Sequence, residues 1–155
     1  MQIGSLHSQK NPNAYWINHS GFWLTYFTII AILHFSLMSI PFFSTAVAWT
    51  LTNALHSFSS YLAFHFVKGA PFDTESVDEG AMKFRTHWEQ IDKGKQMTWT
   101  KKMLIVVPVI LFILASFYTE YAINHSIVNM IALLVGVLPK LPQFHLVRFF
   151  GINEF

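Results

Sequence analysis

A long stretch without charge constrains this chain more than any other feature. From Gly21 to Val67 the sequence contains no Lys, Arg, Asp or Glu. A charge at the centre of a bilayer costs about 2.5–3.5 kcal/mol on insertion scales, so such a run indicates residence in lipid. A spanning helix needs about 20 residues, and the stretch therefore has room for two. Met103–Tyr118 and Tyr121–Pro139 also lack these charges and predict one span each.

Pro41 divides the first stretch, because proline removes a backbone donor and disfavours helix at the preceding residue. The length of 155 residues suits one domain. We therefore predict an all-α, polytopic membrane domain over residues 1–155. Its transmembrane helices are expected at about 21–40, 44–67, 103–118 and 124–138, with a loop at 68–102.

The positive charges lie on one side of this arrangement. The sequence has ten Lys and Arg residues, which fall in the N-terminal segment, in the central loop and after the last span. The two opposite turns, near Pro41 and from Glu120 to Asn124, have none. Cytosolic loops carry an excess of Lys and Arg, so both termini and the central loop are predicted to be cytosolic.

The central loop is predicted to contain an amphipathic helix at about 76–93. Ser76 and Glu79 have the spacing of a capping box, which opens a helix. Four apolar residues then follow at helical spacing: Ala81, Phe84, Trp88 and Ile91. We expect this helix to lie on the membrane or on a partner protein.

The sequence offers little for chemistry. It has no cysteine, and no two of its eight histidines are three or four residues apart, so we predict no metal site, no cofactor and no catalytic residues. The net charge of +2 gives no argument for nucleic-acid binding. Polar residues inside the first two spans are expected to bond neighbouring helices. They are His34, Asn53, His56, Ser57, Ser60 and His65.

A series of short motifs resembles the ORMDL (Orm) family. They begin with Asn11-Pro12-Asn13 and Trp23-Leu24-Thr25-Tyr26, and continue with Val67-Lys68-Gly69-Ala70-Pro71-Phe72 and Thr86-His87-Trp88-Glu89-Gln90. The strongest match is Pro139-Lys140-Leu141-Pro142-Gln143, continuing to Val147-Arg148. Their order and spacing extend over essentially the whole chain.

The resemblance implies a non-catalytic subunit of the endoplasmic reticulum membrane that binds the large subunits of serine palmitoyltransferase. That enzyme condenses serine with palmitoyl-CoA, and the family inhibits it when ceramide is abundant. In the mechanism that the family suggests, ceramide orders the N-terminal segment of the regulator, which then obstructs the acyl-CoA path. Ceramide and membrane lipid are thus the expected ligands.

The resemblance also implies site residues. The asparagine that binds the ceramide headgroup falls on Asn13, and a supporting histidine falls on His87. An amide side chain can both donate to and accept from an amide-and-hydroxyl headgroup. From the residues alone, a turn into the first helix is the favoured interpretation of Asn11-Pro12-Asn13. A partner interface is expected at Asn11, Pro12, Trp88, Pro139 and Arg148.

Two features depart from the family pattern. Ala14-Tyr15-Trp16 follows Asn13 where the family has a hydroxyl and then a base, and the loop between Phe72 and Thr86 is about two residues longer than expected. Two other functions stay open. A small transporter or channel is disfavoured by spans without charge, and an assembly or trafficking factor for membrane proteins is compatible with the sequence.

Overall fold

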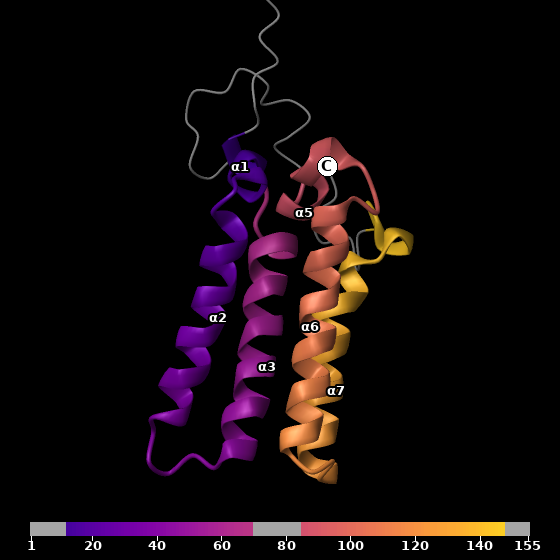
Figure 1. The fold of residues 1–155 in the computed structure, drawn as a ribbon. Coiled ribbons are helices and arrows are strands. Elements are labelled where there is room, and N and C mark those ends of the chain that lie inside the picture. Colours follow the sequence, from indigo (N-terminus) through magenta and orange to yellow (C-terminus); the bar gives the residue numbers. More distant parts are fainter. Residues whose placement is uncertain (1–11, 70–84, 148–155) are drawn as a thin grey trace, which may run out of the picture.

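A computed structural model describes residues 12–69 and 85–147 of the chain, in which the regular secondary structure is helical apart from a single antiparallel bridge between Lys68 and Thr86. Four long helices run side by side, and short helices cover one end of them (Figure 1). The predicted all-α fold is confirmed.

The long helices lie within a few residues of their predicted positions. They are α2 (Phe22–Met38), α3 (Thr45–Tyr61), α6 (Trp99–Tyr118) and α7 (Ile123–Val137). The π-helical segment η2 (Leu62–Phe66) continues α3, and the 3-10 turn η4 (Leu138–Lys140) continues α7. The largest difference is the start of α6, four residues before the predicted one, because Thr98 caps the helix there.

Two of these helical segments are long and apolar enough to cross a membrane: Trp99–Tyr118 and Ile123–Lys140. A third apolar helix, α2, is slightly shorter at 17 residues. Many of the apolar side chains of α2 point outward, including Leu24, Ile29, Ile32 and Phe35. An outward apolar surface is what a helix in lipid, or against a partner helix, requires.

Helix α3 is the centre of the bundle, since it contacts α2, α6 and α7. Its polar side chains bond the neighbouring helices. The Tyr26 hydroxyl lies 2.7 Å from His56 Nε2, and His34 Nδ1 lies 2.9 Å from Thr52 Oγ1. The amide of Asn53 donates to Asn129 Oδ1 over 3.0 Å. The predicted interhelical role is thus confirmed for His34, Asn53 and His56.

His65 and Ser57 do not follow this prediction. Neither His65 Nε2 nor Ser57 Oγ has a hydrogen-bond partner among the described residues. The His65 ring lies against Trp88 instead, with 5.6 Å between the ring centroids. Ser57 faces Gly136, where an added Cβ would lie 2.9 Å from Ser57 Oγ. The small size of both residues therefore permits α3 and α7 to approach closely.

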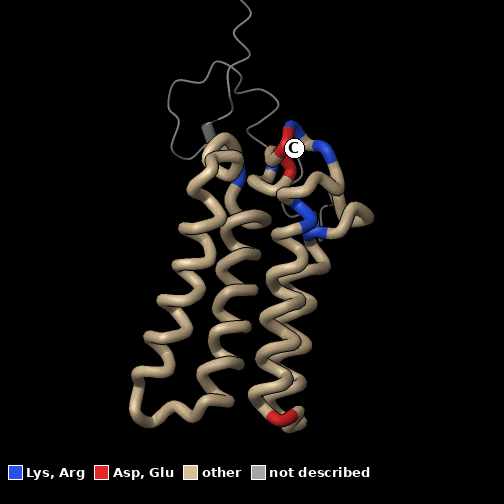
Figure 2. The backbone as a smooth tube through the Cα atoms, in the orientation of Figure 1, with Lys and Arg blue, Asp and Glu red and all other residues tan. Residues whose placement is uncertain are grey.

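Charge divides the bundle into two unlike ends. Figure 2 shows that the described Lys and Arg residues lie at the end of the bundle that carries α1 and α5. Glu120 lies at the opposite end, in the turn between α6 and α7. The end with the basic residues also holds the short helices (Figure 1).

Candidate functional site

The candidate site lies where the start of the described chain meets the end of the central loop. Helix α1 (Pro12–Tyr15) leads into the 3-10 turn η1 (Trp16–Asn18), and α5 (His87–Gln90) leads into η3 (Ile91–Gly94). Helix α1 contacts both α5 and η3. Two segments more than 70 residues apart in sequence are thereby brought together at the basic end of the bundle (Figure 1).

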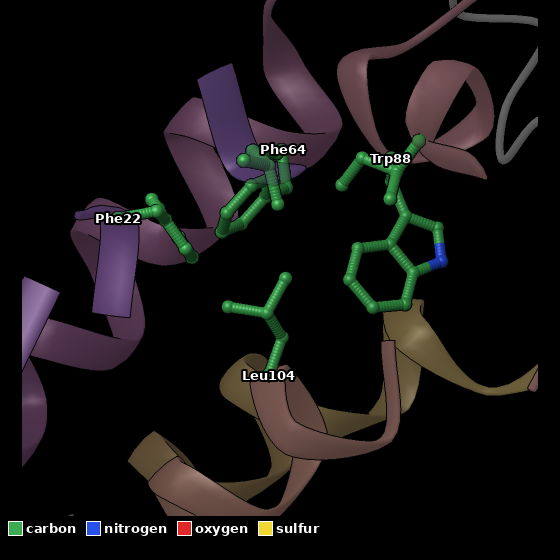
Figure 3. Close-up of a cluster of buried hydrophobic side chains, with 6 residues drawn as sticks. Phe22, Phe64, Trp88 and Leu104 are labelled. Atoms are coloured by element: carbon green, nitrogen blue, oxygen red, sulfur yellow. The ribbon is translucent and has the colours of Figure 1, made fainter. Parts of the chain in front are cut away.

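A buried apolar cluster fixes these short helices to the long ones. It comprises Ile17, Phe22, Phe64, Trp88, Ile91 and Leu104. Figure 3 shows Phe22, Phe64, Trp88 and Leu104 converging from α2, η2, α5 and α6. Ile17, Ile91 and Leu104 are at most 1% exposed. Full burial of such a side chain is worth about 1.5–3 kcal/mol, so this cluster anchors both α1–η1 and α5–η3.

Helix α5 begins at a capping box that the sequence analysis did not identify. Thr86 is extended, its backbone N–H donates to Glu89 Oε2 over 2.9 Å, and its hydroxyl accepts from the Glu89 N–H. The spacing Thr-x-x-Glu was visible in the sequence. Ser76 and Glu79, the predicted capping pair, lie outside the described residues.

The predicted continuous helix over 76–93 is wrong in its described part. The extended backbone at Thr86 interrupts it, and α5 has only four residues. The chain then enters the left-handed region at Asp92 and Lys93, with φ of 54° and 57°, which ends the helix. Asp92 stabilises this turn because it accepts hydrogen bonds from Thr98 Oγ1 and, over 3.4 Å, from Asn18 Nδ2.

Hydrogen bonds also join the two ends of the segment 70–84. The His87 N–H donates to the Val67 carbonyl over 3.2 Å, and the Gly69 N–H donates to the Arg85 carbonyl over 3.1 Å. The side-chain amide of Gln90 donates to the Gly69 and Arg85 carbonyls, over 3.0 and 3.1 Å. We call this paired region the neck; it comprises residues 67–69 and 85–87. The neck holds α5 against the end of η2.

Aromatic rings surround His87 on two sides. Its ring centroid lies 5.7 Å from that of Trp16 and 5.6 Å from that of Phe64. His87 is partly exposed, whereas Phe64 is buried. The imidazole is therefore held between η1 and η2, and part of its surface stays accessible.

Trp88 has a different place from the predicted one. Its side chain is only 3% exposed, and it packs on Phe64 within the bundle's own core. The ammonium group of Lys101 lies 5.4 Å from its ring centroid. The described part of the apolar stripe, Trp88 and Ile91, thus faces the protein's own helices instead of a membrane surface or a partner.

A cavity of about 520 Å³ lies beside this site, between α2 and α3. Trp16 and Phe64, whose rings contact His87, line it at one end, and Leu33 lines it among the apolar side chains of α2. Tyr26, His56 and Ser60 supply polar atoms to the same cavity. A mostly apolar cavity with a few polar groups is the usual form of a small-molecule site.

The other predicted site residues are only partly described. Pro12 and Asn13 form the start of α1, so Asn13 belongs to the helix that contacts α5, where His87 lies. Asn11 and Arg148 lie outside the described residues. Pro139 lies in η4 and lines a second, apolar cavity of about 510 Å³ with Phe58, Tyr61 and Phe144. No residue lines both cavities.

Sequence reasoning missed Ile17 and Phe64, which are buried at the site. Both stand at the edge of an apolar run, where nothing in the spacing separates a core residue from a lipid-facing one. Within residues 12–69 and 85–147, no three His, Asp or Glu side chains gather as a metal site would require. The groups around the site can hydrogen-bond and enclose an apolar molecule.

Comparison with known proteins shows relatives over the whole length of the chain. Residues 11–148 match the ORMDL family. The chain is 49% identical to ORM1-like protein 2 of Homo sapiens and to ORM1-like protein 1 of Danio rerio, and 47% identical to ORM1-like protein 3 of Mus musculus. Each alignment covers 100% of both chains.

The chain belongs to the ORMDL family. The predicted resemblance is confirmed, and the family match extends over all four long helices and both short helices of the site. The short helices and the neck are therefore part of an ORMDL chain and not an addition to it.

Proposed function

We propose that this ORMDL chain is a non-catalytic regulatory subunit that binds the large subunits of serine palmitoyltransferase and inhibits the enzyme in response to ceramide. We place it in the endoplasmic reticulum membrane, with four spans and both termini in the cytosol. Its family membership supports the regulatory role. The one-sided distribution of Lys and Arg supports the orientation.

The observation that carries the proposal is the contact between α1 and α5 beside the cavity. This contact brings the segment that contains Asn13 to the helix that begins at His87. Ceramide has an amide-and-hydroxyl headgroup and two apolar chains. An asparagine and a histidine at the basic end suit the headgroup, and the apolar side chains of Ile29, Ile30 and Leu33 in the cavity suit a chain.

The rival functions receive less support. A channel needs polar groups that line a path, but Thr52 and Asn53 are buried and bonded to α2 and α7. An assembly factor would bind many client proteins. Purification of the full chain from cells separates the three, because our proposal requires stoichiometric serine palmitoyltransferase, an assembly factor many clients, and a channel none.

The decisive experiment is a ceramide titration of serine palmitoyltransferase activity with wild-type protein and Asn13→Ala. We expect the variant to assemble fully, because the long helices supply most of the packing area. Loss of one hydrogen-bonding group in a site shielded from water costs about 1–3 kcal/mol, which corresponds to about a 5- to 150-fold weaker response to ceramide. A ligand shifts a population only by its differential affinity, so the inhibited state becomes rare at ordinary ceramide levels.

Asn124→Ala is the control, because Asn124 is exposed in the first turn of α7, at the opposite end of the bundle. It should respond to ceramide as the wild type does. Unchanged inhibition in a fully assembled Asn13→Ala complex would remove Asn13 from the site and leave Asn11-Pro12-Asn13 as a turn into the first helices.

A further inference from the structure

Lys140 is buried inside the bundle although it carries a charged group. It is 2% exposed and lies at the end of the turn η4 that follows α7. Its ammonium group donates to Ser60 Oγ over 2.8 Å and to the Leu104 carbonyl oxygen over 3.0 Å. Lysine is almost never fully buried unless its charge is compensated, so these acceptors need an explanation.

Pro108 explains why the Leu104 carbonyl is available. Within an α-helix the carbonyl of residue 104 would accept from the N–H of residue 108. Pro108 lies inside α6 and has no N–H, so that hydrogen bond is not formed. The carbonyl oxygen of Leu104 is therefore left as an acceptor in a buried part of the helix, where a backbone acceptor without a partner is costly. Lys140 reaches it from a different helix.

The same ammonium group lies over an aromatic ring of the candidate site. Lys140 Nζ is 5.8 Å from the centroid of Phe64, and the Phe64 ring contacts His87. A desolvated cation over an aromatic face is worth up to about 2 kcal/mol at a buried site, which is about a 30-fold effect on an equilibrium. A chain of contacts thus runs from the carbonyl in α6, through Lys140 and Phe64, to His87.

We propose that Lys140 is a positioning residue for the candidate site. Its ammonium group, held by the Leu104 carbonyl that Pro108 leaves free and by Ser60, fixes the Phe64 ring against His87. The contact between Lys140 and α6 depends only on the fold, whereas the effect on ceramide binding rests on the proposed function. Two independent measurements therefore test the two parts.

The first measurement is a double-mutant cycle in the full-length protein, unfolded reversibly by a denaturing detergent. Lys140→Met leaves the Ser60 hydroxyl and the Leu104 carbonyl buried without this donor, and should lower the folded-to-unfolded ratio by about 5- to 150-fold. Pro108→Ala restores an N–H that can bond Leu104. In the Pro108→Ala background, Lys140→Met should therefore lower the folded-to-unfolded ratio by a severalfold smaller factor. Additive effects of the two substitutions would overturn the contact as we describe it.

The second measurement is ceramide inhibition of assembled serine palmitoyltransferase complexes. Lys140→Met should raise the ceramide concentration for half-inhibition by about 2- to 30-fold, the range expected for the cation over Phe64. The double variant Pro108→Ala/Lys140→Met should regain stability but keep this shift. Lys102→Met is the matched control, since Lys102 is an exposed lysine of α6, the helix that Lys140 contacts, and it should respond as the wild type does.

Each outcome decides one part of the proposal. A double variant that regains the wild-type ceramide response would show that Lys140 acts only through stability, and would overturn its positioning role. If ceramide fails to inhibit even the wild-type complex, the proposed function fails and the positioning role fails with it. The cycle would still decide the contact between Lys140 and α6.

Discussion

His56 shows how an apolar bundle accommodates one polar side chain. It is 7% exposed, and its Nε2 is satisfied by the Tyr26 hydroxyl of the neighbouring helix. Hydrogen bonds between membrane helices average about 0.6 kcal/mol and reach about 1.7 kcal/mol. The contribution of His56 to stability is thus modest, and its main effect is to define which faces of α2 and α3 meet.

Trp88 makes a larger contribution because it fills volume. A substitution by alanine leaves a cavity among Phe64, Ile91 and Leu104. We expect Trp88→Ala to lower the free energy of unfolding by about 3–5 kcal/mol, the usual cost of removing a large aromatic side chain from a core. Equilibrium unfolding of the full chain in mixed micelles measures this loss.

Trp99→Ala is the matched control for Trp88→Ala. Trp99 is 63% exposed in the first turn of α6, so its truncation should change stability by less than about 1 kcal/mol. Equal losses from the two substitutions would contradict the placement of Trp88 in the core.

Among the elements, α5 depends most on a single residue at its start. With only four residues it cannot be stable alone, so its cap and its packing must supply the stability. We expect Thr86→Ala, which removes the hydroxyl that accepts from Glu89, to cost about 0.5–2 kcal/mol. Unfolding measurements on Thr86→Ala and Thr86→Ser test this. Because serine retains the accepting oxygen, Thr86→Ser should lower the free energy of unfolding by only a small part of that amount.

The long helices could be predicted because the sequence has long runs without charge, as a helix in lipid would require. The predicted helix boundaries were wrong where a helix contains charged residues. Lys101 was taken as part of the loop, yet it is buried within α6 and lies over Trp88. A lysine at a helix end can place its charge in a protein core as well as in water, and the sequence does not distinguish the two.

The predicted amphipathic helix failed for a related reason. Its apolar spacing was real, since Trp88 and Ile91 do lie in one apolar cluster. The prediction assumed a continuous helix facing a membrane or a partner, but the extended residue Thr86 breaks the helix and the bundle itself covers the apolar side chains. Only tertiary contacts, such as those of Ile17 and Phe64, decide which surface a short apolar stripe meets.

The charged residues of the whole molecule are distributed unevenly between its two ends. The Lys and Arg residues of 12–69 and 85–147 gather at the end with the short helices, and the opposite turns carry only Glu120 as a charged residue (Figure 2). In the orientation that we propose from the positive-inside rule, the candidate site faces the cytosol. Enzymes that use water-soluble substrates such as serine and acyl-CoA are accessible from that side.

Glycosylation tests this orientation. The sequons Asn18-His19-Ser20 and Asn124-His125-Ser126 should both stay unmodified in cells, the first because it is cytosolic and the second because it lies at the start of α7, close to the membrane. A sequon within a long spacer inserted between Glu120 and Ala122 should be glycosylated. The glycan is detected as a shift in electrophoretic mobility that an endoglycosidase removes.

The same spacer inserted between residues 70 and 84 serves as the control, and it should stay unmodified on the cytosolic side. A glycan at Asn18, or on the spacer in 70–84, would reverse the orientation and place the candidate site in the lumen.

The neck has a consequence for how ORMDL chains can vary in length. Because residues 67–69 pair with residues 85–87, the chain leaves and re-enters the bundle about 5 Å apart, whatever lies between. Closing a loop costs only about 0.6 kcal/mol more for each doubling of its length. The closure of the neck therefore depends little on the number of residues between its two sides, and α5 can keep its place when that number changes.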